Sequence, residues 1–541
     1  MKEGIVEAES GHRHSHGQGS TLAAPESKRE VSVRPDVKDA AMKILRSRDA
    51  YKGFEELQDK PPRVEVFGWC LYEFCSYFIQ TLLIPVVFPL IISQLQQLST
   101  DPVQAWLKDH QGFTCGEKEI TLYSKLTERT IRVSGSNFSS FEWTSIAWAV
   151  GIGLVAPILG FVSYHLDGQF PTLITTVATG VGVFFCLPAG FFRTTKIFIP
   201  YIAGIVTAIT VAVASHTHHL GLMLRGYTGP ILSKNQFPIR QGISGWLSLY
   251  STAAGSLGAA IIAAFTYHML REPKDDELLS LWIVSIFSGL LWLLGILHVF
   301  TATSRSSDSI SFSSKFHPFS VFRYPHALGG LAAVFLSSFS TMCIFTGGVI
   351  FIVGQLCIKP VHLLLFWLTY FLFPVLSLPL LQPLQHLIKA NSVKMQILGF
   401  LLSIFSSGFG FYFHDNQWRW GHLLIFGAIQ STSTGLLHAF GRVLVLDCAP
   451  SGKEGAFSIW FAWIRAVGLC AGFTVGSVVP GRIRTSLGAA FCAAISGIFL
   501  LLFGNISDVA GAVDAGHVTE DSERSSTVPV HGLDSKPPVI V

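Results

Sequence analysis

Residues 435–468 read GLLHAFGRVLVLDCAPSGKEGAFSIWFAWIRAVG, and this stretch decides the fold. It contains the expected end of one membrane helix, a short polar turn and the expected start of a second membrane helix. The charged side chains that crowd the turn are Arg442, Asp447, Lys453 and Glu454. Arg465 follows about ten residues into the apolar run that begins at Ala456, so a helix would carry it about 15 Å inward, close to mid-bilayer.

A charge at that depth is costly, so Arg465 is expected to face a bundle interior or a water-filled path rather than lipid. Three interpretations stay open. Its planar guanidinium suits a substrate carboxylate, it can pair with Glu73 as a gate, or it can make a structural contact to backbone carbonyls. The first two point to transport, which makes Arg465 the main functional indication in the sequence.

The composition is that of an integral membrane protein. Half of the 541 residues are hydrophobic and 13% are charged, which is too few charges to cover a soluble protein of this size. The formal charge of +4 is small and dispersed, so no nucleic-acid binding is expected. No cleavable signal peptide is visible at the polar N-terminus, and the first membrane helix is expected to direct insertion.

Nine cysteines are present, and all but Cys115 lie in or beside apolar runs. Cys115 lies in a long polar loop and has no partner in that loop. We therefore expect no disulfide framework, and the lack of paired spacings predicts no metal site of the zinc type. No cofactor motif or catalytic constellation stands out, so an enzyme is not expected.

Twelve apolar runs are long enough to span a bilayer, at about twenty residues per crossing. They are approximately 66–95, 141–165, 170–192, 197–221, 243–268, 278–302, 327–357, 361–384, 393–413, 421–446, 456–479 and 485–506. A polar interruption after the sixth run predicts two six-helix halves, the architecture of the major facilitator superfamily. The predicted fold is thus an all-α integral membrane protein with about twelve transmembrane helices.

The expected organisation follows from these runs. It comprises a cytosolic tail at 1–63, a first six-helix half at 64–303, a central cytosolic loop at 304–325, a second half at 326–506 and a cytosolic tail at 507–541. An even number of spans places both tails on one side of the membrane. The excess of Lys and Arg that favours the cytosol for this side is modest, because the loop at 96–140 is basic as well.

The loop at 96–140 also contains a glycosylation sequon, Asn137-Phe138-Ser139. Sequons are modified only on the lumenal or extracellular side of a membrane. Asn137 is therefore predicted to carry a glycan, and the two tails are predicted to lie on the opposite side.

Polar side chains recur on one face of two of the expected helices. The members are Glu73 and Gln80 in the first helix, and Gln430, Thr434 and His438 in the tenth. Such a stripe is costly in lipid, so we expect both to face a central cavity. The alternatives are a structural hydrogen bond between helices or an interfacial position for Glu73, and helix packing for the small polar residues.

Two histidine clusters invite a metal-binding or pH-sensing interpretation. One lies at residues 12–16 in the N-terminal tail, where a disordered tail is the favoured interpretation. The other lies at residues 216–219, at the expected cytosolic end of the fourth helix. For this second cluster we favour an interfacial position without a specific role.

Four stretches share one family pattern. Residues 67–74 read FGWCLYEF, similar to a Gly-Trp-x-x-Tyr-Asp start with Glu73 as the acid, and residues 156–160 and 243–258 match the second and fifth helices. The turn at 450–457, PSGKEGAF, is close to a Pro-x-Gly-Lys-Glu-x-x-Phe turn. The matching positions are Pro450, Gly452, Lys453, Glu454 and Phe457. This pattern resembles the autophagy-related vacuolar amino-acid effluxer family.

The resemblance implies a multi-pass protein of the vacuolar membrane, with the plasma membrane as the second option. It also implies export of amino acids, leucine among them, from the lumen to the cytosol. We predict a secondary transporter that works by alternating access within the lipid bilayer, with proton coupling left open. A transporter of another organic solute (sugar, peptide or lipid-like) and a non-transporting receptor or scaffold on the same fold remain alternatives. The predicted substrate-binding or gating residues are Glu73, Gln80, Gln430, Thr434, His438 and Arg465.

Overall fold

The computed structural model describes ten segments of the chain. They are residues 60–96, 115–167, 171–229, 231–271, 277–302, 318–357, 360–413, 418–450, 452–478 and 482–519. The histidine cluster at 12–16 lies outside the described residues, and so does most of the central loop at 304–325.

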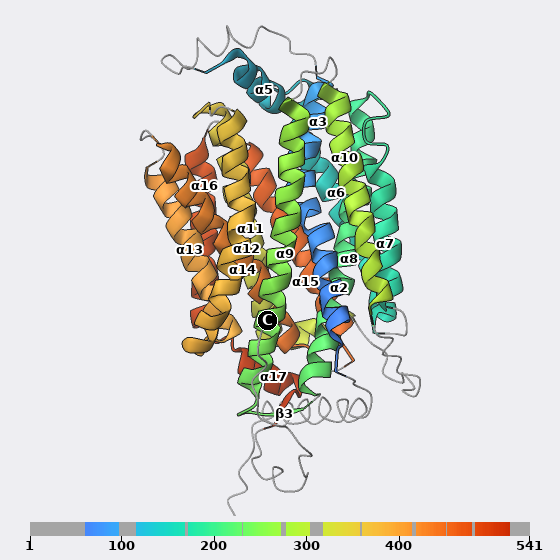
Figure 1. Cartoon of the computed structure of the whole chain (residues 1–541), viewed down its shortest axis with the longest axis vertical. Helices are drawn as coiled ribbons and strands as arrows, with labels where there is room; N and C mark the ends of the chain where they lie inside the picture. Colours follow the sequence, from blue (N-terminus) through green and yellow to red (C-terminus); the bar gives the residue numbers. More distant parts are fainter. Residues whose placement is uncertain are drawn as a thin grey trace, which may run out of the picture. The chain divides into compact units, whose positions relative to one another are not determined.

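The described chain is almost entirely helical, as predicted (Figure 1). The first six membrane segments are α2 (Arg63–Phe78) continued by η1 (Ile79–Val87) and α3 (Phe88–Gln94), α6 (Ser140–Leu166), α7 (Pro171–Cys186), α8 (Phe198–Thr228), α9 (Phe237–Arg271), and α10 (Glu277–Leu294) continued by η3 (Gly295–Phe300). The second six are α11 (Pro325–Gly354), α12 (Pro360–Leu387), α13 (Ser392–Tyr412), α14 (Trp420–Asp447), α15 (Glu454–Val478) and α16 (Ile483–Phe503). We refer to these two sets as the first and second halves.

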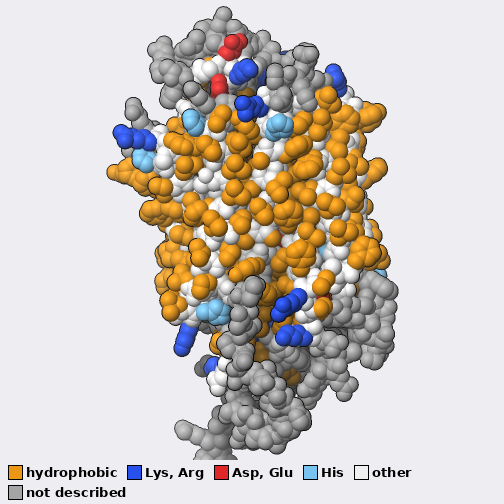
Figure 2. Space-filling view, in the orientation of Figure 1, with side chains coloured by type: hydrophobic (Ala, Val, Ile, Leu, Met, Phe, Trp, Pro, Cys, Tyr) orange, Lys and Arg blue, Asp and Glu red, His pale blue; other side chains and the backbone are white. Residues whose placement is uncertain are grey.

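Eleven of the described helices are long and apolar enough to cross a membrane. The third expected span forms the shorter α7, whose 16 residues are apolar and are followed by a turn. Hydrophobic side chains cover the middle of the face shown in Figure 2, and Lys and Arg side chains gather toward its two ends. This distribution suits a hydrocarbon layer between two aqueous phases, so the protein is a multi-pass integral membrane protein.

Shorter elements lie at the two ends of the helices. They are α5 (Glu117–Thr127), the antiparallel strands β1 (Ile131–Val133) and β2 (Ser136–Phe138), η2 (Thr195–Ile197), β3 (Leu232–Ser233), η4 (Pro318–Arg323), α17 (Asp508–Ala515) and β4 (Val518–Thr519). Figure 1 shows α5 at one end of the bundle and α17 at the other. We call these the α5 end and the α17 end.

The first membrane segment is not one regular helix. Between α2 and α3 the chain forms the π-helical segment η1, which contains Gln80 and Pro85. Proline has no N–H to continue an α-helical hydrogen-bond ladder, and π-helical turns within longer helices are frequent at functional sites. The irregular turn therefore lies beside one of the predicted cavity residues.

The two halves meet along pairs of helices. From the first half α9 packs against α12 and α14, and α6 and α8 pack against α15. Within the second half α15 approaches α11 so closely that a Cβ on Gly472 would lie 2.4 Å from the Phe339 carbonyl oxygen. Gly468 and Gly476 make similar close approaches one turn to either side, which is the small-residue packing that membrane helices use. This packing fixes α15, and with it Arg465, against α11.

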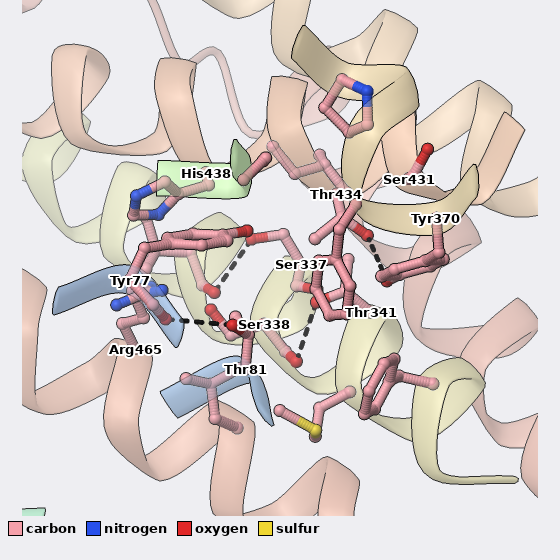
Figure 3. A pocket seen from close by; sticks show the side chains of 18 of the residues that line it. Tyr77, Thr81, Ser337, Ser338, Thr341, Tyr370, Ser431, Thr434, His438 and Arg465 are labelled. Carbon is pink, nitrogen blue, oxygen red and sulfur yellow. Dashed lines mark hydrogen bonds between the residues drawn. The ribbon is translucent and has the colours of Figure 1, made fainter. Parts of the chain in front are cut away.

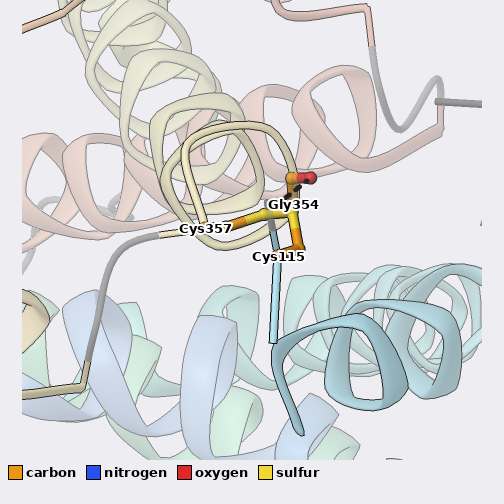
Figure 4. The surroundings of a disulfide bond; sticks show 3 residues. All are labelled: Cys115, Gly354 and Cys357. Carbon is orange, nitrogen blue, oxygen red and sulfur yellow. Dashed lines mark hydrogen bonds between the residues drawn. A yellow bond between two sulfur atoms is a disulfide. The ribbon is translucent and has the colours of Figure 1, made fainter. Parts of the chain in front are cut away.

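One expectation about the cysteines is wrong. Cys115 forms a disulfide with Cys357, 242 residues further along the chain, with the Cα atoms 5.3 Å apart (Figure 4). The partner of Cys115 lies outside the polar loop, just beyond the end of α11. The disulfide links the segment before α5 to the second half at the α5 end.

The chain after α16 is also more ordered than a simple polar tail. Strand β4 pairs in parallel with β3, which lies between α8 and α9, and the Leu232 amide donates to the His517 carbonyl at 2.8 Å. Asp508 accepts hydrogen bonds from Gln241 of the first half and Asn391 of the second half. Residues 508–519, which we call the C-terminal strap, thus connect the two halves at the α17 end.

Candidate functional site

A cavity lies between the two halves. Its wall contains hydroxyl groups, aromatic rings, one imidazole and one guanidinium (Figure 3). The polar and aromatic side chains of the wall include Tyr77, Thr81, Ser256, Ser337, Ser338, Thr341, Tyr370, Ser431, Thr434, His438 and Arg465. The elements η1, α2, α9, α11, α12, α14 and α15 supply them, so both halves contribute. A cavity at such an interface changes shape when the halves move relative to each other.

Arg465 lies near the middle of α15 and is 7% exposed. Its Nη1 atom donates to Gln80 Oε1 at 2.5 Å. Within the described segments, no carboxylate forms an ion pair with it. The interpretation of Arg465 as the counter-charge of Glu73 is therefore not what the structure shows: Gln80 takes that place, and the guanidinium keeps its full charge without an anion beside it.

Glu73 lies in a smaller pocket that adjoins the cavity and shares Tyr77, His438 and Arg465 with it. Its carboxylate lies 3.3 Å from Arg442 Nη1 and 2.9 Å from His438 Nε2. The sequence placed Arg442 in the polar turn, but it lies inside α14 and is 1% exposed. The side chain of Arg442 also donates to Ser248 and Thr252 of α9, so it connects the halves.

His216 of α8 completes the surroundings of Glu73. Its Nε2 donates to the Trp69 carbonyl at 3.0 Å, and its Nδ1 lies 3.1 Å from the Glu73 carboxylate. A neutral imidazole carries one ring proton, and in His216 this proton is on Nε2. No proton then lies between His216 Nδ1 and an ionised Glu73 carboxylate. An attractive contact there requires one further proton, either on His216 or on Glu73. The Glu73–His216 pair is therefore a close carboxylate–imidazole contact inside the bundle.

The other two histidines of the 216–219 cluster are paired as well. His218 lies 3.2 Å from Asp167, and His219 lies 2.9 Å from Glu65. All three rings are buried. The rings are therefore buried rather than interfacial, and each one faces a carboxylate from another segment. That the cluster has no specific role stays a prediction. In the part of the chain that the structure describes, no group of three or more His, Cys, Asp or Glu is placed to hold a metal ion.

The predicted stripe on α14 is divided between two pockets. Thr434 and His438 line the central cavity, where Thr434 lies 3.4 Å from the Tyr370 hydroxyl. Gln430 instead lines an adjacent apolar pocket inside the second half. The stripe also continues beyond its predicted end, since Arg442 follows His438 by four residues. The same four-residue spacing, extended by one step, places Arg442 on the face of α14 that carries Thr434 and His438, and Arg442 lines the smaller pocket beside the cavity.

The turn at 450–457 forms the junction of α14 and α15. Gly452 has φ +72°, a left-handed conformation that favours glycine. The Lys453 amide donates to the Pro450 carbonyl at 3.0 Å, and Phe457 is buried against Tyr324. Glu454 begins α15 and pairs with Arg225 of α8 at 3.1 Å. The turn therefore holds an ion pair between the halves as well as a close backbone bend.

Three further contacts between the halves lie at the α17 end. Arg240 of α9 pairs with Asp447 of α14 at 3.3 Å. The Gly455 amide donates to Asp167 at the end of α6 at 2.9 Å, and a Cβ on Gly455 would lie 2.8 Å from that carboxylate. The C-terminal strap adds its contacts around Asp508. Together with the pairs of Glu73 and Arg225, these contacts form what we call the ionic seam.

Asn137 does not belong to the cavity wall and lies in a solvent-exposed hairpin instead. It is exposed on the β1–β2 hairpin, opposite Arg132 in the strand register. Ser139 of the same sequon caps α6 by accepting a hydrogen bond from the Glu142 amide. The side chain of Asn137 is accessible, as a glycan-bearing residue must be.

No protein-family model matches the sequence, and no curated protein sequence matches it either. The crystal structure of the human organic anion transporter MFSD10 (TETRAN) superposes with a TM-score of 0.53 at 14% sequence identity. The match covers 82% of this chain and all of that chain. At this identity the likeness concerns the fold alone, and it shows that the chain has the all-α membrane fold of the major facilitator type.

Proposed function

We propose that the protein is a secondary transporter of small organic solutes that carry a carboxylate. The observation that carries the proposal is Arg465, a buried guanidinium in a cavity between two helical halves, with no anion beside it in the described chain. A buried charge without a partner is destabilising, and a carboxylate-bearing solute would supply the partner. Because both halves line the cavity, rocking of one against the other would expose it to each side in turn.

The charge balance around the cavity supports a substrate with a negative group. With the histidines neutral, the positive charges of Arg442 and Arg465 face the one negative charge of Glu73. At least one positive charge remains uncompensated, since a proton added at the Glu73–His216 contact would increase the excess. An anion, or the carboxylate end of a zwitterion, would neutralise it, and the protein of similar fold is described as an organic anion transporter.

Within this class we propose amino-acid export to the cytosol, on the strength of the family resemblance of the stretches at 67–74 and 450–457. Glu73 is already paired with Arg442 and two histidines, so it is not free to bind the ammonium group alone. Hydroxyl oxygens of the cavity wall, such as those of Tyr77 and Ser338, are the available acceptors for an ammonium. We propose the vacuolar membrane as the location.

For the orientation we propose that the α5 end faces the lumen or the exterior and that the α17 end faces the cytosol. Two observations at the α5 end support this. The Cys115–Cys357 disulfide would form in an oxidising compartment, and Asn137 is exposed within its sequon. Removal of N-linked glycans by a glycosidase should shift the mobility of the wild-type chain and leave Asn137→Gln unchanged.

We further propose that transport is coupled to protons through Glu73. His216 and His438 both contact its carboxylate, and the His216 contact requires an added proton to be attractive. Protonation of Glu73 would weaken its pairing with Arg442 across the halves. Proton binding and the position of the halves would then be linked.

The test is flux in proteoliposomes with an imposed pH difference. Labelled leucine and labelled lactate distinguish a zwitterionic from an anionic substrate. Arg465→Leu should abolish uptake of the transported solute, and Arg465→Lys should retain part of it by keeping the charge. Arg484→Leu is the matched control, because Arg484 is exposed and lies against Phe411 away from the cavity. Equal flux in Arg465→Leu and wild type would overturn the assignment, and absence of flux with both solutes would favour a receptor or scaffold.

A further inference from the structure

The C-terminal strap contacts the first half through β4 and α17. In the pairing of β3 with β4, Val518 is the register partner of Leu232, and the Leu232 amide donates to the backbone of the strap at 2.8 Å. Val518 is 2% exposed and packs with Phe237, at the start of α9, in one buried apolar cluster. The Gln241 side chain of α9 donates to Asp508. We call residues 232–241 the docking surface of the strap.

The strap makes a second set of contacts with the second half. Asn391, just before α13, donates to Asp508 Oδ1 at 3.1 Å. A Cβ on Gly511 would clash with Cys448 Sγ, so α17 lies closely against the end of α14. Helix α17 contacts α11 as well. The strap therefore bridges the docking surface of the first half and several helices of the second half.

The link between α16 and the strap decides which of these contacts can separate. Only four residues, 504–507, lie between the end of α16 and the start of α17. Four fully extended residues reach about 14 Å, so the strap cannot travel far from the second half. Ile506 of this link is also buried among second-half side chains, in the space that a Cβ on Gly329 of α11 would fill. When the halves separate at the α17 end, the strap should stay with the second half and leave the docking surface.

We propose that the C-terminal strap is an autoinhibitory latch: docked on residues 232–241 it holds the α17 end closed, and it must undock before that end opens. The inference rests on the proposed alternating access, in which the halves separate at the α17 end. The docked contacts suit repeated release, because water replaces each hydrogen bond when the strap leaves, so that each contributes little net stability. Occupancy of the docking surface would then set how often the α17 end opens.

A reversible covalent staple tests whether undocking is required. Register partners on neighbouring strands lie about 5 Å apart, so Leu232→Cys with Val518→Cys brings two thiols within reach of a disulfide. The full-length variant is placed in proteoliposomes and treated with a membrane-permeant oxidant. Flux of the labelled solute that the wild type transports should be lost on oxidation and should return with reductant. Wild type given the same reagents is the control, since its Cys115–Cys357 disulfide meets the reductant too.

A release variant tests whether the docked strap holds the α17 end closed. Val518→Asp puts a carboxylate into the apolar contact with Phe237, where it cannot be hydrated, so the undocked strap is favoured. Asn505→Asp is the matched control, because it adds the same charge at an exposed position of the link and leaves the docking surface unchanged. Asn505 has φ 49°, a conformation that aspartate also adopts.

The measurement on the release variant needs no transport. Spin labels at Arg63 and Lys394, exposed in the first turns of α2 and α13, report the distance between the halves at the α17 end. The more accessible free cysteines, Cys70 and Cys492, are replaced first. Without any solute, the distance distribution should shift to longer values in the release variant and should match the wild type in the control variant.

A longer label distance in the release variant, together with loss of flux in the oxidised staple, supports the latch. A longer distance with no flux in any of the proteins also supports it and counts against the proposed transport instead. If Val518→Asp does not fold, the staple alone decides, because its oxidised and reduced forms differ only in the crosslink: equal label distances and equal flux in the two forms overturn the proposal. A folded release variant with the wild-type distance, or an oxidised staple that transports at the wild-type rate, overturns it as well.

Discussion

The two ends of the helical bundle join the halves by different chemistry. At the α17 end the contacts are the ion pairs and hydrogen bonds of the ionic seam, for example Arg240 with Asp447 and Arg225 with Glu454. Toward the α5 end the contacts are apolar and aromatic: Phe473 of α15 packs against Phe141 and Trp148 of α6, within one large hydrophobic cluster. A disulfide is added there.

This difference indicates how each end can open. Ion pairs that separate into an aqueous path exchange a protein partner for water, so the net cost is small and depends on charge and protonation. Apolar contacts that separate expose nonpolar surface to water. This exposure costs about 25 cal/mol per Å² and does not depend on pH. On the proposed mechanism, the α17 end is therefore the end that proton and substrate binding would control, and the α5 end would respond mainly to packing.

The largest expected effect comes from the centre of the ionic seam. Arg442→Leu removes the cation that lies 3.3 Å from Glu73 and that also binds Ser248 and Thr252. Breaking a buried pair by deleting one partner costs about 3–5 kcal/mol, so a marked fall in the melting temperature is expected. Adding Glu73→Gln should restore part of the loss. A double variant as unstable as the sum of the two single variants would show that the two side chains are not coupled.

The next largest effect is expected at the opposite end. Cys115→Ser with Cys357→Ser removes the disulfide between the segment before α5 and the end of α11. Such a loss costs about 2–4 kcal/mol in many proteins. Thermal unfolding under non-reducing conditions should show the decrease, while addition of reductant should lower the melting temperature of the wild type only. A wild-type melting temperature that does not respond to the reductant would contradict the link.

Two glycines give a matched comparison of the ends. A Cβ on Gly455 would lie 2.8 Å from Asp167 at the α17 end, and one on Gly354 would lie 2.2 Å from the Tyr123 ring at the α5 end. Each alanine variant should cost about 1–3 kcal/mol through crowding. Only Gly455→Ala should also raise the reactivity of cysteines introduced along the ionic seam toward a polar thiol reagent. The same reactivity in both variants would remove the proposed distinction between the ends.

The smallest effect is a local pH response of the C-terminal strap. Burial lowers the pKa of His517 from 6.5 to about 4, although its ring bonds to the backbone of Ala449. A lowered pKa means that the neutral ring stabilises the bound strap, and that this stabilisation is lost as the pH falls below about 6.5 toward 4. Burial raises the pKa of Asp508, which acts in the opposite direction because its protonated form favours the bound strap.

Hydrogen exchange of residues 508–519 between pH 7 and pH 5 measures this response after correction for intrinsic rates. Protection should fall on acidification in the wild type. The variant His517→Asn has no titrating ring, so its protection should change less and should reveal the contribution of Asp508. Equal pH dependence in the two proteins would show that His517 does not control the strap.

Much of the fold followed from hydropathy. The helices of the structure coincide with the twelve apolar runs, because a bilayer demands a continuous apolar length for each span. The third run was overestimated: it extends to 192, but α7 ends at Cys186. The π-helical turn at 79–87 was not anticipated, although Pro85 marks it.

Contacts between distant segments were much harder to foresee. A disulfide across 242 residues and the pairing of Glu73 with Arg442 both depend on how the halves pack, which periodicity within one helix does not encode. The spacing correctly grouped Thr434 and His438 on one cavity wall, but Gln430, one turn earlier, passes behind Tyr370 into a separate pocket. The roles of the predicted cavity residues in binding or gating stay predictions.

The central claim is that the halves rock around the Arg465 cavity and that the ionic seam opens while the α5 end closes. Two distances measured by spin-label resonance test it most directly. With Cys70 and Cys492 replaced, labels at the exposed positions Lys234 and Lys389 span the α17 end, and labels at Arg193 and Tyr412 span the α5 end. On lowering the pH and adding the transported solute, the first distance should lengthen and the second should shorten. Two distances that both stay fixed, or that lengthen together, would contradict the account.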